Sequence, residues 1–219
     1  MQSVEERKLR DILRKNPGSL LELLQLGKLL IDKGRLEGAS GALPILLRAV
    51  MRMESGHPLA GSKWGTVTEV YLRLGREKRA LIGAQKALML SSIRDREIQR
   101  RMWRVIRDAC ERLNLSLMWN EDAATPSKGD ILATLAEAFN QLGEYDRAVD
   151  IGGFIDETLN APSPRAFNAI GYAYRELGNT EASERAYAFA QRLFLKENGY
   201  PKPTLRKTMP PKEEERKTS

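Results

Sequence analysis

The clearest pattern of apolar and polar positions in this chain runs from Phe167 to Ala190. Phe167, Ile170 and Tyr174 recur at helical spacing, so they lie on one face of a predicted helix. Gly178 follows that helix, and a glycine just past a helix end takes the left-handed conformation that caps free carbonyl groups. A second helical pattern then ends at Ala190. The stretch therefore predicts one helix–turn–helix unit.

Two small residues predict where the helices of this unit touch. Gly171 lies among the apolar positions of the first helix, and Ser183 lies on the inner face of the second. Because neither side chain fills the space between the helices, we expect a close crossing at Gly171.

The same spacing recurs upstream along the chain. Gly143 precedes Gly178 by 35 residues, Gly75 precedes Gly143 by 68, and Gly34 precedes Gly75 by 41. A two-helix period near 34 residues predicts a solenoid, in which each unit buries its apolar face against its neighbours. The matching positions are Leu132, Leu135, Phe139 and Tyr145 in one copy, Trp64, Val67, Tyr71 and Ala80 in the next, and Leu23, Leu26, Gly27 and Leu30 in the first.

On these positions the chain resembles the tetratricopeptide-repeat family over most of residues 17–197. The best matches are Trp64, Tyr71, Gly75, Ala80 and Ala87 in one copy, and Leu26, Gly27, Gly34 and Ala39 in another. The resemblance implies an all-α fold, an α-solenoid of about four to five helix–turn–helix repeats over residues 1–199. The expected units are 20–53, 62–92, a degenerate 93–128, 129–161 and 164–197.

Segments outside the regular units carry their own predictions. Residues 2–15 predict a short amphipathic helix that caps the first repeat. Residues 200–219 are rich in proline, lysine and glutamate and are expected to be disordered, because they have too little apolar surface to offset the entropy of ordering. Pro44 is expected to kink the second helix of unit one. The extra residues of the 41-residue step are expected in a loop at 54–63.

The degenerate third unit predicts one long helix over 93–113, followed by a degenerate second half and a loop. The apolar residues of that second half are expected to be buried rather than to form an exposed contact patch. They are Leu115, Leu117, Met118 and Trp119.

The chain has a formal net charge of +7 and a pI near 9.6, which suggests a partner with an acidic surface. Seven arginines and four acids fall between Arg94 and Arg112. The arginines spread around more than one helix face, which weakens the case for a continuous cationic stripe. The four acids are spaced to pair with arginines along the helix, so we expect them to neutralise much of the charge. A helix of that kind favours a solvated surface over a stripe that binds nucleic acid.

Nothing in the sequence predicts catalysis, a metal or a cofactor. His57 is the single histidine, and the segment 56–63 lacks the Gly-Lys-Ser/Thr order of a phosphate-binding loop. The single cysteine, Cys110, is expected to pack in the core and fits a reducing compartment. No apolar run has the length of a signal peptide or a membrane span. We therefore expect a cytoplasmic protein, although a mature form that had lost its signal would look the same.

The resemblance implies that the first helices of successive units line a concave groove that holds a partner segment. The leading hypothesis is a non-catalytic protein–protein interaction scaffold, with an apolar N-terminal end of the groove and amide groups and an arginine at its C-terminal end. Leu24 and Glu69 stand where the chaperone-binding branch of the family has a lysine–asparagine clamp, so we do not expect that specificity. The candidate groove residues are Leu24, Lys28, Ile31, Glu69, Arg73, Glu137, Asn140, Asn168, Tyr172 and Arg175.

Two alternatives remain open. A basic accessory protein that binds nucleic acid or a ribonucleoprotein would use the arginine-rich helix and the basic tail. A self-assembling structural component would use the end of the solenoid at Leu193, Phe194 and Leu195, where no capping helix is predicted.

Overall fold

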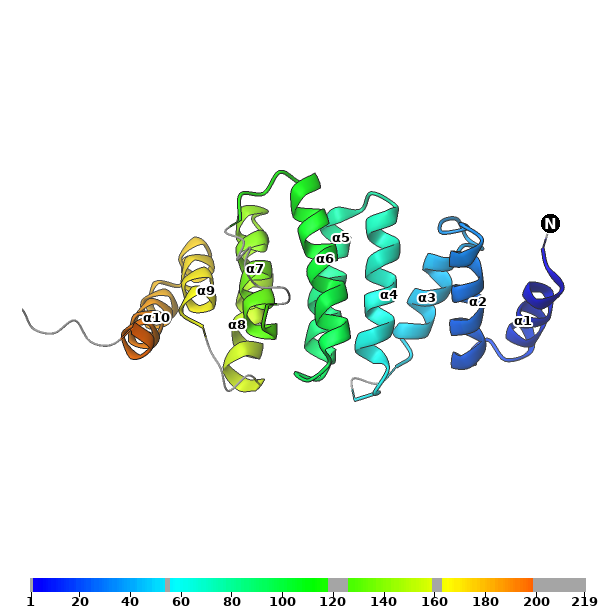
Figure 1. The fold of residues 1–219 in the computed structure, drawn as a ribbon, viewed down its shortest axis with the longest axis horizontal. Coiled ribbons are helices and arrows are strands. Elements are labelled where there is room, and N and C mark those ends of the chain that lie inside the picture. The colour runs from blue at the N-terminus through cyan, green and yellow to red at the C-terminus, as the bar shows by residue number, and fades with distance from the viewer. Residues whose placement is uncertain (1, 54–55, 118–125, 159–162, 199–219) are drawn as a thin grey trace, which may run out of the picture.

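The computed structural model describes residues 2–53, 56–117, 126–158 and 163–198, and its helices stand side by side in one elongated row (Figure 1). Over these residues the chain is helical without a strand, so the predicted all-α solenoid is confirmed there. The predicted tail at 200–219 lies outside the described residues. The helices are α1 (Val4–Lys15), α2 (Leu20–Asp32), α3 (Ala42–Val50), α4 (Ala60–Arg73), α5 (Glu77–Leu90), α6 (Arg96–Arg112), α7 (Lys128–Gln141), α8 (Tyr145–Thr158), α9 (Pro164–Glu176) and α10 (Thr180–Asn198).

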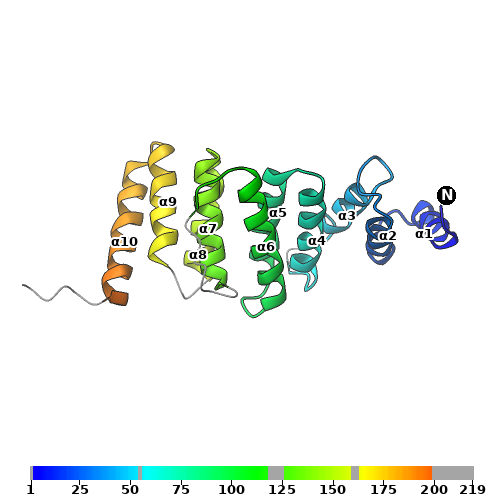
Figure 2. The same cartoon turned by 45° about the horizontal axis from the view of Figure 1, so that its top comes forward.

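Most of these helices pair as antiparallel hairpins. The pairs are α2 with α3, α4 with α5, α7 with α8, and α9 with α10. In Figure 1, α4, α6 and α7 stand toward the viewer and α5 and α8 lie behind them, an arrangement that Figure 2 also shows. We call the surface formed by α2, α4, α6, α7 and α9 the first-helix face.

Every helix of the first-helix face ends in the same backbone turn. After α4, the N–H of Arg76 donates to the carbonyl of Tyr71 at 2.9 Å, across Gly75 with a φ of 63°. Gly34, Gly143 and Gly178 take the equivalent place after α2, α7 and α9, each with a positive φ. This is the glycine-capped helix end that the sequence pattern predicts.

The turn after α6 uses asparagine in place of glycine. Asn114 has a φ of 54°, and the N–H of Leu115 donates to the carbonyl of Cys110 at 3.0 Å, the same bond that closes the other turns. Asparagine tolerates the left-handed region better than other side chains that carry a Cβ. By its C-terminal turn, α6 is therefore the first helix of a third unit.

That third unit is incomplete over the described residues. Residues 115–117 are not helical, and α6 packs on α7 as well as on α4 and α5. The side chain of Gln141 holds this segment, since it accepts from the N–H of Ser116 at 3.0 Å and donates to the carbonyl of Ser116 at 2.6 Å. Leu115 and Leu117 are partly buried against the core, as expected. Met118 and Trp119 lie outside the described residues.

Two predictions about unit one need correction. Pro44 is the third residue of α3, where the missing N–H has no helical carbonyl to reach, so it lies in the first turn and has no reason to kink the helix. The loop predicted at 54–63 ends earlier, because α4 already begins at Ala60. The connection between α2 and α3, residues 33–41, holds a large part of the extra length.

The close crossing predicted at Gly171 is present. A Cβ built on Gly171 would lie 3.0 Å from the ring of Tyr187 on α10. The hydroxyl of Ser183 donates to the carbonyl of Gly171 at 2.8 Å, which also requires the two helices to be close.

The predicted N-terminal cap is fixed to the first hairpin by one buried carboxylate. Glu6 of α1 is fully buried and accepts hydrogen bonds from Arg10, Lys33 and Arg35, the last at 2.7 Å. Burial alone raises the pKa of a carboxyl group. Here the three cationic donors outweigh that effect and lower the pKa of Glu6 from 4.5 to about 2.

Candidate interaction surface on the first-helix face

A hollow on the first-helix face lies between α4 and α6. It has a volume of about 340 Å³. Leu72 and Val105 supply apolar side chains to its lining, and both are mostly buried. The rest of the lining is charged, with four arginines and two acids. These are Arg73, Arg101, Arg104, Arg112, Glu69 and Asp108.

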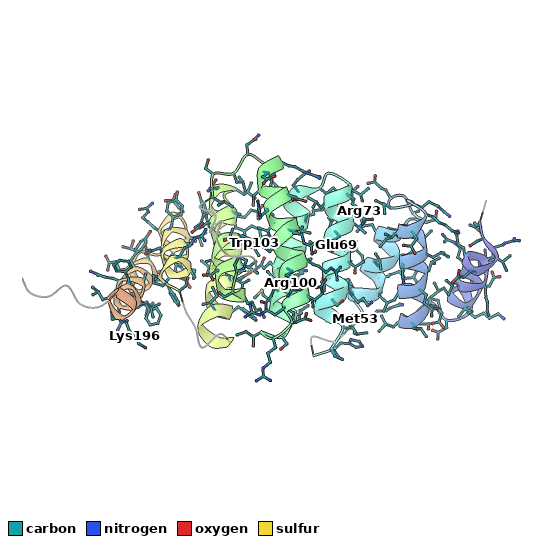
Figure 3. The ribbon with its side chains drawn as sticks, viewed as in Figure 1. Met53, Glu69, Arg73, Arg100, Trp103 and Lys196 are labelled. Carbon is teal, nitrogen blue, oxygen red and sulfur yellow. The ribbon has the colours of Figure 1, made fainter. Side chains whose placement is uncertain are left out.

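Two of these arginines are held by neighbouring helices. Arg101 donates from Nε and Nη2 to the two carboxylate oxygens of Glu69, at 2.9 and 3.0 Å. In Figure 3, Glu69 lies between α4 and α6. Arg112 donates to the carbonyl of Leu72 at 2.9 Å and lies 3.7 Å from the carboxylate of Glu77 on α5. These bonds fix α6 against the hairpin before it.

The other two arginines of the hollow have a different environment. Within the described residues, no hydrogen bond or ion pair engages Arg73, which is labelled in Figure 3, or Arg104, and both are exposed. Pairing along α6 is also less extensive than expected, because Arg100 and Glu97, at 3.8 Å, form the one such pair in the described part of that helix. Among the described residues, the hollow therefore keeps two cationic groups without a partner.

A second set of bonds joins α7 to α9. Arg165 binds both carboxylate oxygens of Glu137 through Nε and Nη2. The amide of Asn140 donates to the carbonyl of Ala169 at 2.7 Å, while its Oδ1 is buried without a partner among the described residues. The carboxylates of Glu69 and Glu137 and the amide N–H of Asn140 therefore bind neighbouring helices of the solenoid, although they were predicted to bind a partner.

The other candidate groove residues divide into covered and exposed groups. Leu24 and Ile31 are partly buried and pack against the core, whereas Lys28 is exposed. Toward the C-terminus, Asn168 is exposed and Tyr172 is 37% exposed. The lysine, the asparagine and the tyrosine are available to a partner.

Arg175 lies against its own neighbours. Its guanidinium is 4.8 Å from the ring centre of Tyr172 and 3.2 Å from the carboxylate of Glu176. Tyr172 also lies beside Tyr145 of α8, with ring centres 6.3 Å apart. These contacts place Arg175 and Tyr172 together at the α9 end of the surface, and that the two bind a partner stays a prediction.

Sequence reasoning missed the arginines that bind the groove acids. Arg101 follows Glu69 by 32 residues, and Arg165 follows Glu137 by 28. Opposite charges about one repeat apart fall at similar heights on successive first helices, so this spacing was an available signal.

No constellation of catalytic groups accompanies this surface in the described residues. Cys110 is fully buried in the core, as expected, and burial, with the charge of Glu111, raises its pKa to about 12. The Nδ1 of His57 accepts from the N–H of Leu59 at 3.1 Å, in the turn that leads into α4. In the described ranges, no three His, Cys, Asp or Glu side chains are grouped to hold a metal, and none of the helices there is long and apolar enough to cross a membrane.

Comparison with known proteins identifies one repeat directly. Residues 164–193, which cover α9 and most of α10, match the family model described as "Tetratricopeptide repeat". No curated protein sequence is significantly similar to the chain.

Two solved structures are similar over most of their length. MamA is 17% identical with a TM-score of 0.36, and the match covers 89% of this chain and 90% of MamA. BtubC (BKLC) from P. vanneervenii is 17% identical with a TM-score of 0.35, and the match covers 94% of this chain and 92% of BtubC.

Proposed function

We propose that the chain is a non-catalytic scaffold of the tetratricopeptide-repeat type that binds one segment of another protein along its first-helix face. The family match at residues 164–193 supports this proposal. The tetratricopeptide fold serves protein–protein interaction in general. The segment lies across α2, α4, α6, α7 and α9 and holds its own protein in an assembly. The scaffold works in the cytoplasm, a location that rests on the sequence alone.

The observation that carries this proposal is that some candidate residues bind neighbouring helices of the solenoid while others on the same helices are exposed to solvent. Glu69, Glu137 and Asn140 bind the next first helix, which fixes α4 against α6 and α7 against α9. A surface fixed in this way loses little entropy when it binds. The exposed side chains on the same helices, among them Arg73 and Asn168, are then the ones that contact the partner.

Site-specific photo-crosslinking in the native cell tests this assignment. A photoreactive amino acid is placed at Lys28, Asn168 or Tyr172 on the first-helix face, and at Arg79 or Gln191 on the second helices as matched exposed controls. We expect the same partner segment to be crosslinked from the three first-helix positions and identified by mass spectrometry. Crosslinks confined to Arg79 and Gln191 would overturn the proposal.

Self-association is a second candidate, favoured by one observation at the end of the solenoid. Phe194 on α10 is 56% exposed, and Leu193 beside it is only partly buried. A second copy of the chain that stacks on α10 would cover this surface. Sedimentation over a range of concentrations tests it, and a monomer at every concentration would exclude it.

A further inference from the structure

We propose that the hollow between α4 and α6 is the anchor point for a carboxylate-rich part of the partner segment, bound by Arg73 and Arg104. This inference rests on the proposed function and specifies the chemistry of the ligand. It concerns one hollow of about 340 Å³, which has room for a few side chains of the partner.

The charge of the hollow selects an anionic ligand. Four arginines and two acids line it, so the lining carries an excess of positive charge. Glu69 already binds Arg101 through both oxygens, and Glu77, outside the lining, lies beside Arg112. The excess therefore resides on Arg73 and Arg104, and Asp108 offsets only part of it.

The geometry of the hollow suits carboxylates in particular. The guanidinium of Arg101 shows that a carboxylate binds in bidentate fashion on this surface, and Arg104 lies one helical turn away on the same helix. Leu72 and Val105 exclude water from part of the lining, which strengthens a charge–charge contact beside them. An acidic residue with a small apolar neighbour matches both features.

A protein segment fits the hollow better than a nucleic acid does. Proteins that bind single strands combine a cationic groove with aromatic rings on which the bases stack, and none of the described residues that line this hollow is aromatic. Glu69 and Asp108 also interrupt the row of cations that would follow a phosphate backbone. The lining therefore favours a short acidic peptide.

A defined probe tests the inference without knowledge of the natural partner. The probe is a fluorescein-labelled peptide of twelve residues that alternates glutamate with alanine, and its binding to the full chain is measured by fluorescence anisotropy. A peptide of alternating glutamine and alanine is the uncharged control, and a labelled twelve-nucleotide oligouridine is the nucleic-acid control. We expect the acidic peptide to bind at about 50 mM salt and to weaken severalfold at about 200 mM, because exposed charge contacts are screened.

Matched variants locate the binding. Arg73→Gln with Arg104→Gln removes the two cations of the hollow, and Lys8→Gln with Arg79→Gln removes two exposed cations from α1 and α5. We expect the first pair to weaken peptide binding by about tenfold and the second by less than about twofold, since bidentate contacts contribute more than long-range attraction. Circular dichroism of both variants tests that the helices are retained.

Each remaining outcome decides against the inference. No binding at low salt, an equal loss in both variant pairs, or tighter binding of oligouridine than of the peptide would overturn it. Photo-crosslinks from Lys28, Asn168 and Tyr172 that persist in the Arg73→Gln, Arg104→Gln variant would overturn the acidic anchor and leave the scaffold function standing. Crosslinks found only at the second-helix controls would overturn the scaffold function itself.

Discussion

Arg101 on α6 and Glu69 on α4 form a two-point ion pair, with both carboxylate oxygens bound at 2.9 and 3.0 Å. The two side chains are 23% and 33% exposed, so the pair is partly shielded from water. The hydrogen bonds that Arg101 donates to Glu69 also raise the pKa of Arg101. In the described residues α6 has no second helix of its own to pack against. The ion pair with Glu69 therefore helps to hold α6 against the preceding hairpin.

The first prediction concerns the strength of that pair. In a double-mutant cycle of Glu69→Gln and Arg101→Gln, we expect a coupling free energy of about 1–2 kcal/mol, because the bonds are charge-assisted and bidentate. Urea unfolding of the four proteins measures it. The exposed pair Glu97 and Arg100, at 3.8 Å, is the control and should couple by less than about 0.5 kcal/mol. Equal coupling in both cycles would contradict the interpretation.

The turns and helix pairs could be predicted from the sequence because they are local. Gly34, Gly75, Gly143 and Gly178 mark the ends of first helices, and each has the positive φ that the pattern requires. Asn114 takes the same role without matching the glycine pattern, so the end of α6 was visible only as a break in periodicity.

The candidate site was less predictable because it depends on how neighbouring helices are aligned. The groove positions were assigned from one helix at a time, and that procedure cannot tell a solvent-facing acid from one that meets an arginine on the next helix. Glu69 and Glu137 are of the second kind. The packing of α6 directly on α7, with no second helix of the third unit between them in the described residues, is likewise a relation that no local pattern encodes.

The second prediction tests the close crossing of α9 and α10. Gly171→Val places a branched side chain where a Cβ would already lie 3.0 Å from the ring of Tyr187. We expect a loss of about 1–3 kcal/mol in the free energy of unfolding, because the helices must separate. Gly153 is the matched control, since nothing lies within 4 Å of a Cβ built on that helical glycine. Gly153→Val should be neutral or slightly stabilising, and an equal loss at both sites would refute the crossing argument.

The third prediction concerns the cap at Glu6. The three cations of this cluster lower the pKa of Glu6 from 4.5 to about 2. A carboxylate with a lowered pKa contributes stability that is fully present above pH 4.5 and is lost as the pH falls toward 2. We therefore expect the difference in unfolding free energy between the parent and Glu6→Gln to be about 2 kcal/mol at pH 7 and to shrink below pH 4.5.

The control for this cap is its neighbour on the exposed side of α1. Urea unfolding at pH 7, 4.5 and 3 separates the two variants. Glu5→Gln removes the same charge from a side chain that faces solvent, and it should change the unfolding free energy by less than about 0.5 kcal/mol at each of these pH values. A Glu6→Gln difference that stays constant from pH 7 to 3 would show that the carboxylate is not the source of the stability.

The last prediction concerns Lys128, a buried cation at the start of α7. Its side chain is 3% exposed, donates to the carbonyl of Ser91 at 2.8 Å and lies 4.8 Å from the ring centre of Phe154. Burial lowers its pKa from 10.5 to about 8. Since the unfolded chain keeps the proton between pH 8 and 10.5 while the folded chain releases it, the stability of the parent should rise with pH in this range.

Lys128→Met removes both the charge and its titration. We expect the variant to be more stable than the parent by about 1 kcal/mol at pH 7, because an apolar side chain avoids the cost of burying a charge. This advantage should decrease steadily from pH 8 to 10. Lys78→Met, at an exposed position of α5, is the control and should follow the parent at each pH. Parent and Lys128→Met curves that stay parallel over this range would mean that the buried lysine keeps its proton in the folded chain.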